Sequence, residues 1–378
     1  MMEEFEQACL LMDKGDKDYL TVDHLPLDHV EKPGFKLLIQ RMAPHLKLRN
    51  QNYFKKMLKT KYLFMSQTEK TTTSTFKFAD IDVKLCHPEE MNAKPNIESL
   101  VPGATFTDHM LQASWSIEEE WTRPSIVPIH DIELHPAAKV FHYAIEVSEG
   151  MRAFRGIDGR TRLFRPEIYI QRLIDTTHLV ALPKFDREEF LNCLVQLLQI
   201  ERGWVPSPIT SNMLTSFLLL IYRTSATVGI GYSKEAMLYT IMNPCGPSFH
   251  NGFRPISVVA DAHNIRSWPC GVGATRLGSA YAPTIQVLKE ARDKGFDQIL
   301  WLFGKEGQCT QLGDLNVFFD LVDSSGERQL VTPPLSDLIL AGVTRQSLLE
   351  LVRQWGQWDV VERHIDIHQL LEAHRERR

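Results

Sequence analysis

The stretch Cys270-Gly-Val-Gly-Ala-Thr-Arg-Leu-Gly-Ser-Ala-Tyr-Ala-Pro283 gathers three glycines around one cation, Arg276, and one phenol, Tyr281. Glycine at this density lets backbone approach a ligand more closely than a loop with side chains allows. Glycine also punctuates ordinary turns, so the loop alone does not identify a site. Its meaning depends on the motifs found elsewhere in the chain.

The composition indicates a soluble globular protein of more than one domain. The chain has 378 residues, which favours two or three domains. Apolar residues make up 43% and charged residues 24%, enough for a full core. The net charge of -5 gives no electrostatic footprint for nucleic acid or for a membrane surface. The function must therefore lie in a local site.

The cysteines are scattered, with no pair at the spacing of a metal site or a redox motif. This pattern favours free thiols in a reducing compartment and predicts no metal centre. The segment Met1–Lys17 carries four acidic residues before any basic one, unlike a transit peptide. We therefore expect a cytoplasmic location rather than a mitochondrial one. The six cysteines are Cys9, Cys86, Cys193, Cys245, Cys270 and Cys309.

Residues 1–64 differ from the rest and read as a helical segment with a basic end. The run Val30-Glu-Lys-Pro-Gly-Phe-Lys-Leu-Leu38, followed by Met42–Arg49, resembles a fragment of a hAT-type transposase. It contains none of that family's catalytic carboxylates or zinc ligands, so no activity is implied. Residues 65–93 read as a polar linker and tail, and Met65 resembles the start of an independent protein.

From Phe76 onward the pattern is that of an α/β enzyme. Breaker residues at 243–252 indicate a linker, which we place at 248–253, between domains at 94–247 and 254–378. The predicted strands are 106–111, 140–147, 149–155, 213–222, 236–242, 255–260, 297–303 and 315–322. The predicted helices begin near Pro166, Asp186, Pro283 and Gln346, and loops are expected at 331–335 and 340–345.

Three features of this region suit an anion such as a phosphate. They are the glycine loop with its cation, the turn Gly342-Val343-Thr344 that opens a helix, and Arg172. Free N–H groups at a helix start bind anions, and a guanidinium supplies a bidentate counter-charge. Each also has an ordinary structural interpretation: a turn, an N-cap at Thr344, and a surface charge at Arg172.

From about residue 94 to the end, the chain resembles the branched-chain amino-acid aminotransferases, which are fold-type IV enzymes dependent on pyridoxal phosphate. The motifs that carry the resemblance are 103–110, Phe141-His-Tyr-Ala144, Glu149-Gly-Met-Arg-Ala-Phe-Arg-Gly156, 162–166, 300–304, Val331-Thr-Pro-Pro-Leu335 and Gly342-Val-Thr-Arg345.

The resemblance implies an α/β fold with a small N-terminal domain and a larger pseudo-barrel domain, assembled as a homodimer. It also implies amino transfer from leucine, isoleucine or valine to 2-oxoglutarate. Arg172, Val343 and Thr344 would bind the coenzyme phosphate, and Tyr281 would contact the ring hydroxyl. Tyr143 would line the substrate pocket.

Five departures from the family pattern affect this expectation. Arg276 occupies the position of the lysine that bonds covalently to the coenzyme, and an arginine stays protonated. Gln311, in Thr310-Gln-Leu-Gly313, replaces the acid that pairs with the ring nitrogen. Leu218 replaces an arginine on the substrate side, and Ser148 replaces an aromatic residue. The large domain also reads as truncated after Arg378.

These departures predict a branched-chain aminotransferase-like protein that is catalytically impaired. Two alternatives stay open: an active enzyme with an atypical base, and a non-catalytic paralogue or pseudogene product. The paralogue would pair with itself or with an intact family member. Nucleic-acid binding by residues 1–64 is not favoured.

Overall fold

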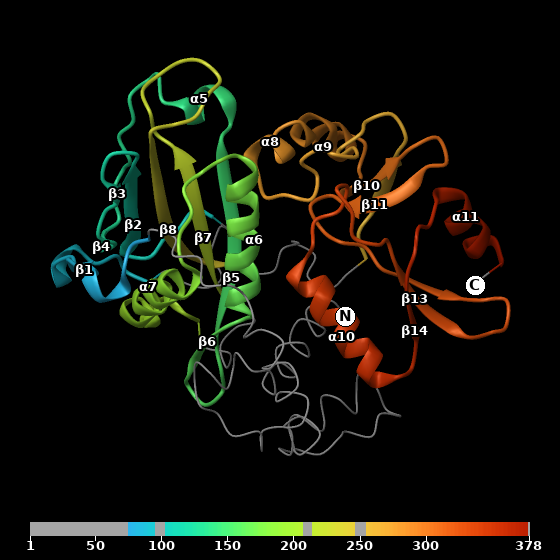
Figure 1. The fold of residues 1–378 in the computed structure, drawn as a ribbon. Helices are drawn as coiled ribbons and strands as arrows, with labels where there is room; N and C mark the ends of the chain where they lie inside the picture. The colour runs from blue at the N-terminus through green and yellow to red at the C-terminus, as the bar shows by residue number, and fades with distance from the viewer. Residues whose placement is uncertain (1–74, 95–102, 207–213, 246–254, 377–378) are drawn as a thin grey trace. The chain divides into compact units, whose positions relative to one another are not determined.

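The computed structural model describes residues 75–94, 103–206, 214–245 and 255–376, which form two compact units (Figure 1). We call residues 75–245 the N-terminal unit and residues 255–376 the C-terminal unit. The hAT-like segment and the predicted linker at 248–253 lie outside the described residues. None of the described helices combines the length and hydropathy that a membrane span requires.

The N-terminal unit is built on one large sheet with the strand order β1-β4-β2-β8-β7-β5-β6. Neighbouring strands are antiparallel except β1 and β4, and a short strand, β3, pairs with β2. Met110, Ile126 and Met151 are fully buried, because alternate residues of these strands face the core. The strands are β1 Asp82–Val83, β2 His109–Ser116, β3 Glu120–Trp121, β4 Ser125–Pro128, β5 Glu146–Arg155, β6 Thr161–Leu163, β7 Leu214–Arg223 and β8 Glu235–Cys245.

Two helices pack on this sheet and against each other: α6 (Pro166–Leu179) along β5, and α7 (Arg187–Ile200) against β2. Pro166 occupies the first turn of α6, where its missing N–H costs nothing. Asp186 caps α7, because its carboxylate accepts hydrogen bonds from the Glu188 and Glu189 amides. Both predicted helix starts are therefore confirmed.

The predicted strand at 140–147 is wrong in its first half. Residues Lys139–Tyr143 form a short helix, α5, and Ala144 then turns the chain with a φ of 47° into β5. Tertiary contacts hold this helical turn: Lys139 Nζ donates to the Gly229 carbonyl, and the Gly229 amide donates to Tyr143 Oη. The apolar alternation here mimics a strand, but these contacts favour the helix.

Residues 75–93, assigned from sequence to a tail, instead contact the sheet. Phe76 is buried, with its ring against those of Trp121, Phe185 and Phe190. Strand β1 pairs with β4, and two single 3-10 turns, at 78–80 and 88–90, flank it. This part of the chain therefore belongs to the N-terminal unit.

The C-terminal unit contains two three-stranded sheets, ordered β11-β10-β9 and β12-β13-β14. Each sheet combines one antiparallel and one parallel pairing. Helix α9 covers β10, and α10 packs on β14. The elements are β9 Val258–Asp261, α8 Gly278–Tyr281, α9 Thr284–Asp293, β10 Gln298–Phe303, β11 Gln308–Leu312, β12 Phe319–Val322, β13 Arg328–Thr332, α10 Val343–Trp355, β14 Asp359–Glu362 and α11 Ile367–Glu376.

Several predicted boundaries need correction. The strands predicted at 106–111, 255–260 and 315–322 begin later, at His109, Val258 and Phe319. Asn243–Cys245 belong to β8, because they continue its pairing with β7. Val331 and Thr332 end strand β13 rather than open a loop. Helix α10 begins at Val343, three residues earlier than expected, because Gly342 and not Thr344 is its N-cap residue.

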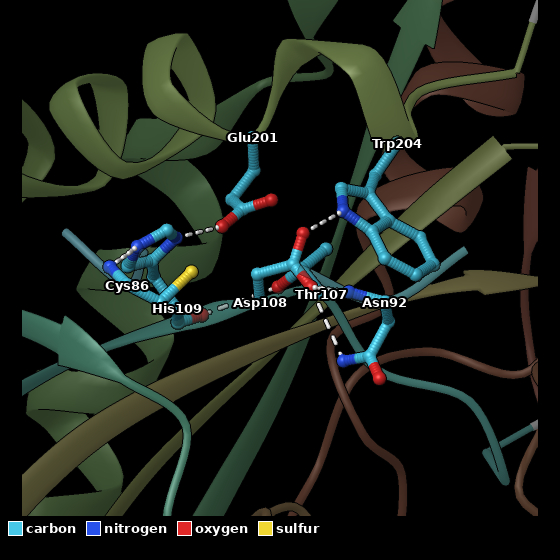
Figure 2. Close-up of polar contacts among 7 residues, drawn as sticks. All are labelled: Cys86, Asn92, Thr107, Asp108, His109, Glu201 and Trp204. Carbon is cyan, nitrogen blue, oxygen red and sulfur yellow. Dashed lines mark hydrogen bonds and ion pairs between the residues drawn. The ribbon is translucent and has the colours of Figure 1, made fainter. Parts of the chain in front are cut away.

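A buried polar cluster joins the start of the N-terminal unit to the sheet and to the end of α7 (Figure 2). His109 Nδ1 lies 2.5 Å from Glu201 Oε1, and the Cys86 amide donates to His109 Nε2 at 2.9 Å. Asp108 accepts from the Trp204 indole and from the Asn92 amide, both at 2.8 Å.

This cluster is built for structure rather than for nucleophilic chemistry. Because the Cys86 amide occupies Nε2, the imidazole proton of His109 lies on Nδ1 and points to Glu201. Nε2 therefore has no lone pair left for the Cys86 thiol. Burial, followed by the charge of Asp108, raises the pKa of that thiol, so the thiolate is disfavoured.

Glu201→Gln should change how stability depends on pH. Burial raises the pKa of Glu201 in the folded protein, so the folded state favours its neutral form. The ordinary pKa of a glutamate is about 4.5. As pH rises from below that value through the raised pKa of folded Glu201, the wild-type chain should lose stability relative to the variant. The expected loss is about 1.4 kcal/mol per unit of raised pKa. Urea unfolding of both proteins between acid and neutral pH measures it, and a constant difference would contradict the assignment.

Candidate functional site

The glycine loop of the C-terminal unit is a tightly packed turn. A Cβ added at Gly273 would lie 2.2 Å from Ser267 Cβ and 2.9 Å from the Asp337 carbonyl oxygen. Such distances are shorter than real contacts allow, so only glycine fits there. The sequence suggested a close approach of this loop to a ligand, whereas the close approach in the structure is to Ser267 and to the Asp337 backbone of the same unit.

The loop rests on residues 336–342, which we call the support segment. Ser267 Oγ donates to the Leu338 carbonyl at 2.9 Å, and Arg266 Nη1 donates to the same oxygen at 3.3 Å. Arg266 Nη2 also donates to the Gly273 carbonyl at 3.0 Å, inside the glycine loop. The Cys270 amide donates to Asp337 Oδ2 at 3.0 Å. These bonds fix the loop on the support segment.

The other end of the support segment is held by β11 and by the loop that follows it. The Leu340 amide donates to Gln311 Oε1 at 2.7 Å, and Asn316 Nδ2 donates to the Leu340 carbonyl at 2.9 Å. A Cβ on Gly342 would overlap Asn316 Oδ1, so a larger residue there would displace the Asn316 side chain. Gln311, the glycine loop and the α10 N-terminus thus meet at one segment.

Arg276 and Tyr281 are direct partners. Arg276 Nη1 donates to Tyr281 Oη at 3.0 Å, and the guanidinium carbon lies 5.2 Å from the ring centroid. Burial lowers the pKa of Arg266, and the charges of Tyr281 and Asp314 partly oppose this effect. The Tyr281 phenol thus has a guanidinium, that of Arg276, as its hydrogen-bond donor.

Gln311 and the first turn of α10 present hydrogen-bond donors. Gln311 is fully buried, and its Nε2 has no hydrogen-bond partner among the described residues. At the helix start, Gly342 is the N-cap residue, and the amides of Val343 and Thr344 have no acceptor within the helix. Val343 is buried and Thr344 is exposed. Donors with this arrangement suit a ligand that combines an anion with a neutral acceptor.

In the N-terminal unit, Arg172 on α6 is the counter-ion of Glu149 on β5. The guanidinium pairs with the carboxylate through Nε at 2.6 Å and Nη2 at 2.7 Å. Glu149 is fully buried, so the pair fixes the position of Arg172 on the sheet. Arg172 is thus mostly buried rather than the surface charge that its sequence also allowed.

The three predicted pocket residues also lie in the N-terminal unit. Tyr143 accepts its hydrogen bond from the loop between β7 and β8. Ser148 on β5 pairs with Leu220 of β7, and Leu218 pairs with Gly150, two residues further along. The β5–β7 pairing therefore places Ser148 and Leu218 at neighbouring register positions.

The residues that hold the support segment were not predicted from the sequence. Arg266, Ser267 and Asn316 are separated from their partners by more than twenty residues. No motif contains both members of a pair. The one available signal was an arginine and a serine directly before a glycine-rich loop, in Ile265-Arg-Ser-Trp268.

Comparison with known proteins places these features in a family context. The family model for amino-transferase class IV matches residues 146–375. A cytosolic branched-chain-amino-acid aminotransferase of Mus musculus is 42% identical over 284 residues, covering 75% of this chain and 73% of the relative. A mitochondrial counterpart of Bos taurus is 38% identical over 311 residues, covering 82% of this chain and 78% of the relative.

Solved structures share the fold. A branched-chain aminotransferase of Thermoproteus uzoniensis with norvaline has a TM-score of 0.56 at 20% identity, covering 70% of this chain and 81% of that chain. The PLP form of the Thermobaculum terrenum enzyme has a TM-score of 0.53 at 19% identity, covering 69% and 78%. The predicted mixed α/β fold of type IV is therefore confirmed.

Gly273→Ala should destabilise the C-terminal unit by about 1–3 kcal/mol, because its Cβ overlaps Ser267 and the support segment. Gly231→Ala is the matched control, since nothing lies within 4 Å of its added Cβ. We expect that control to stay within about 0.5 kcal/mol of wild type. Denaturant unfolding measures both, and equal midpoints would show that the loop is not packed as described.

Proposed function

Because the chain belongs to the class IV aminotransferase family, we propose that it is a branched-chain aminotransferase-like protein that holds pyridoxal phosphate without a covalent bond. Its transaminase activity is lost or very weak. The observation that carries the proposal is the hydrogen bond from Arg276 to Tyr281. The proposed ligands are the coenzyme, a branched-chain amino acid and its 2-oxo acid. The cytoplasmic location stays a prediction, since the relatives include cytosolic and mitochondrial enzymes.

The donors of the C-terminal unit fit the coenzyme. The amides of Val343 and Thr344 would bind the phosphate at the positive end of α10. The unpartnered Nε2 of Gln311 would serve the ring, and Tyr281 its hydroxyl. When bound, the coenzyme supplies an aldehyde that accepts an amino group and a ring that withdraws electrons. In the N-terminal unit, Arg172 stays a predicted phosphate ligand.

The described residues of the C-terminal unit do not suit covalent attachment of the coenzyme. We assign Arg276 to the position of the coenzyme-bonding lysine, on the flanking glycines and Tyr281. A guanidinium keeps its proton at every physiological pH, so it neither attacks an aldehyde nor shuttles a proton. The three lysines among the described residues of this unit, Lys289, Lys294 and Lys305, are all exposed. Lys289 pairs with Asp293 on the surface of α9.

The residues proposed to bind the substrate also differ from the family pattern, in ways that would weaken activity. With Leu218 in place of an arginine, the pocket lacks a proposed cation for a substrate carboxylate. With Ser148 in place of an aromatic residue, it also loses apolar surface for a branched side chain. Tyr143 keeps its position through the Gly229 amide. We therefore propose weak substrate binding in addition to the missing nucleophile.

Borohydride reduction in the presence of pyridoxal phosphate tests the proposal. The wild-type chain should show no coenzyme mass on any lysine peptide and no exchange between leucine and 2-oxoglutarate. Arg276→Lys should capture the coenzyme on residue 276, because a releasable amine then stands there. Arg292→Lys, an exposed position on α9, is the matched control and should capture none.

Peptide mapping also tests the alternative of an active enzyme with an atypical base. Lys139 is the one buried lysine among the described residues, and its Nζ is bound to the Gly229 carbonyl. Coenzyme on Lys139, or on any other lysine of the wild-type chain, would overturn the proposal. Pairing with itself or with an intact family member belongs to the same proposal, and size-exclusion chromatography of co-expressed proteins examines it.

A further inference from the structure

We propose that Gln311 donates a hydrogen bond from Nε2 to the ring nitrogen of pyridoxal phosphate, and that this nitrogen is held unprotonated. The inference rests on the proposed function, since it concerns how the same coenzyme is bound. The proposal depends on one side chain, Gln311, whose amide is oriented by its hydrogen bond with Leu340.

The amide of Gln311 has one allowed orientation. Its Oε1 accepts the Leu340 amide at 2.7 Å, and the side chain is completely buried on β11. The reversed orientation would place the NH₂ group against the N–H of Leu340, donor against donor. The oxygen therefore faces the support segment, and the NH₂ group is the end without an acceptor among the described residues.

That NH₂ group lacks an acceptor among the described residues. A buried donor without a partner is costly, and proteins retain one mainly where something binds. The same Leu340 that orients Gln311 also bonds to Asn316, which packs against Gly342 at the start of α10. The unpartnered donor thus belongs to the contact network that carries the anion-binding helix start.

Hydrogen-bond chemistry then specifies the state of the ring. A pyridine nitrogen accepts from an N–H only through its lone pair, so a protonated ring would oppose one donor with another. A carboxylate at this position would accept from a protonated ring, whereas an amide nitrogen cannot. The Arg276 guanidinium, which is bonded to Tyr281, further disfavours another positive charge on a ring held beside that phenol.

The consequence for the coenzyme is a weaker electron sink. A protonated ring withdraws electrons from the reacting carbon much more strongly than a neutral ring. Gln311 therefore favours the coenzyme with a neutral ring, a form that can bind but is poorly suited to catalysis. Restoring a lysine at position 276 alone should thus restore attachment but not ordinary turnover.

Nitrogen-15 NMR of the full chain, loaded with ring-labelled pyridoxal phosphate, tests the inference. The wild-type resonance should lie at the position of neutral pyridine and stay there across the neutral pH range. Gln311→Glu should move it to the position of pyridinium. Gln308→Glu, on the same strand and only partly buried, is the matched control and should leave it unchanged.

The outcomes separate this inference from the proposed function. Retention of the coenzyme through gel filtration is measured first. If the wild-type chain does not retain it, both proposals fail. If the chain retains it and the ring is protonated, only the role of Gln311 is wrong. The wild-type spectrum decides this by itself, so the inference stays testable even if Gln311→Glu fails to fold.

Discussion

The hydrogen bonds to the backbone of Leu338 and Leu340 are the constraint on which the C-terminal site depends. A buried peptide group must be paired, and here four side chains, three of them buried, supply the partners. Arg266 and Ser267 hold Leu338, while Gln311 and Asn316 hold Leu340. Because these residues come from separate parts of the chain, satisfying two peptide units brings together the glycine loop, β11 and the start of α10.

In our proposal, this framework is kept although the chemistry at its centre differs from that of an enzyme that bonds its coenzyme through a lysine. The glycines, the phenol and the helix start are elements of binding, and all are present. In our proposal, Arg276 and Gln311 instead occupy positions where proton transfer and charge stabilisation are needed. A permanent cation and a neutral amide hydrogen-bond well but change their charge with difficulty. On that proposal, the site favours recognition over turnover.

The sequence predicted features that depend on neighbouring residues. The cap at Asp186 and the proline start of α6 follow from local rules and were found. The helix at 139–143 was missed, because contacts from Gly229 decide it. The pairing of Arg172 with Glu149 was missed for the same reason, since a lone arginine carries no sign of its partner. Long-range contacts thus account for most of the differences.

A crystal structure of the chain grown with pyridoxal phosphate is the most direct test of the central claim. We expect the coenzyme with its phosphate at the start of α10 and a clear gap between its aldehyde carbon and every side-chain nitrogen. Arg276 should still be bonded to Tyr281. Continuous density from that carbon to a lysine would contradict the account, because it would identify a nucleophile that the chain is argued to lack.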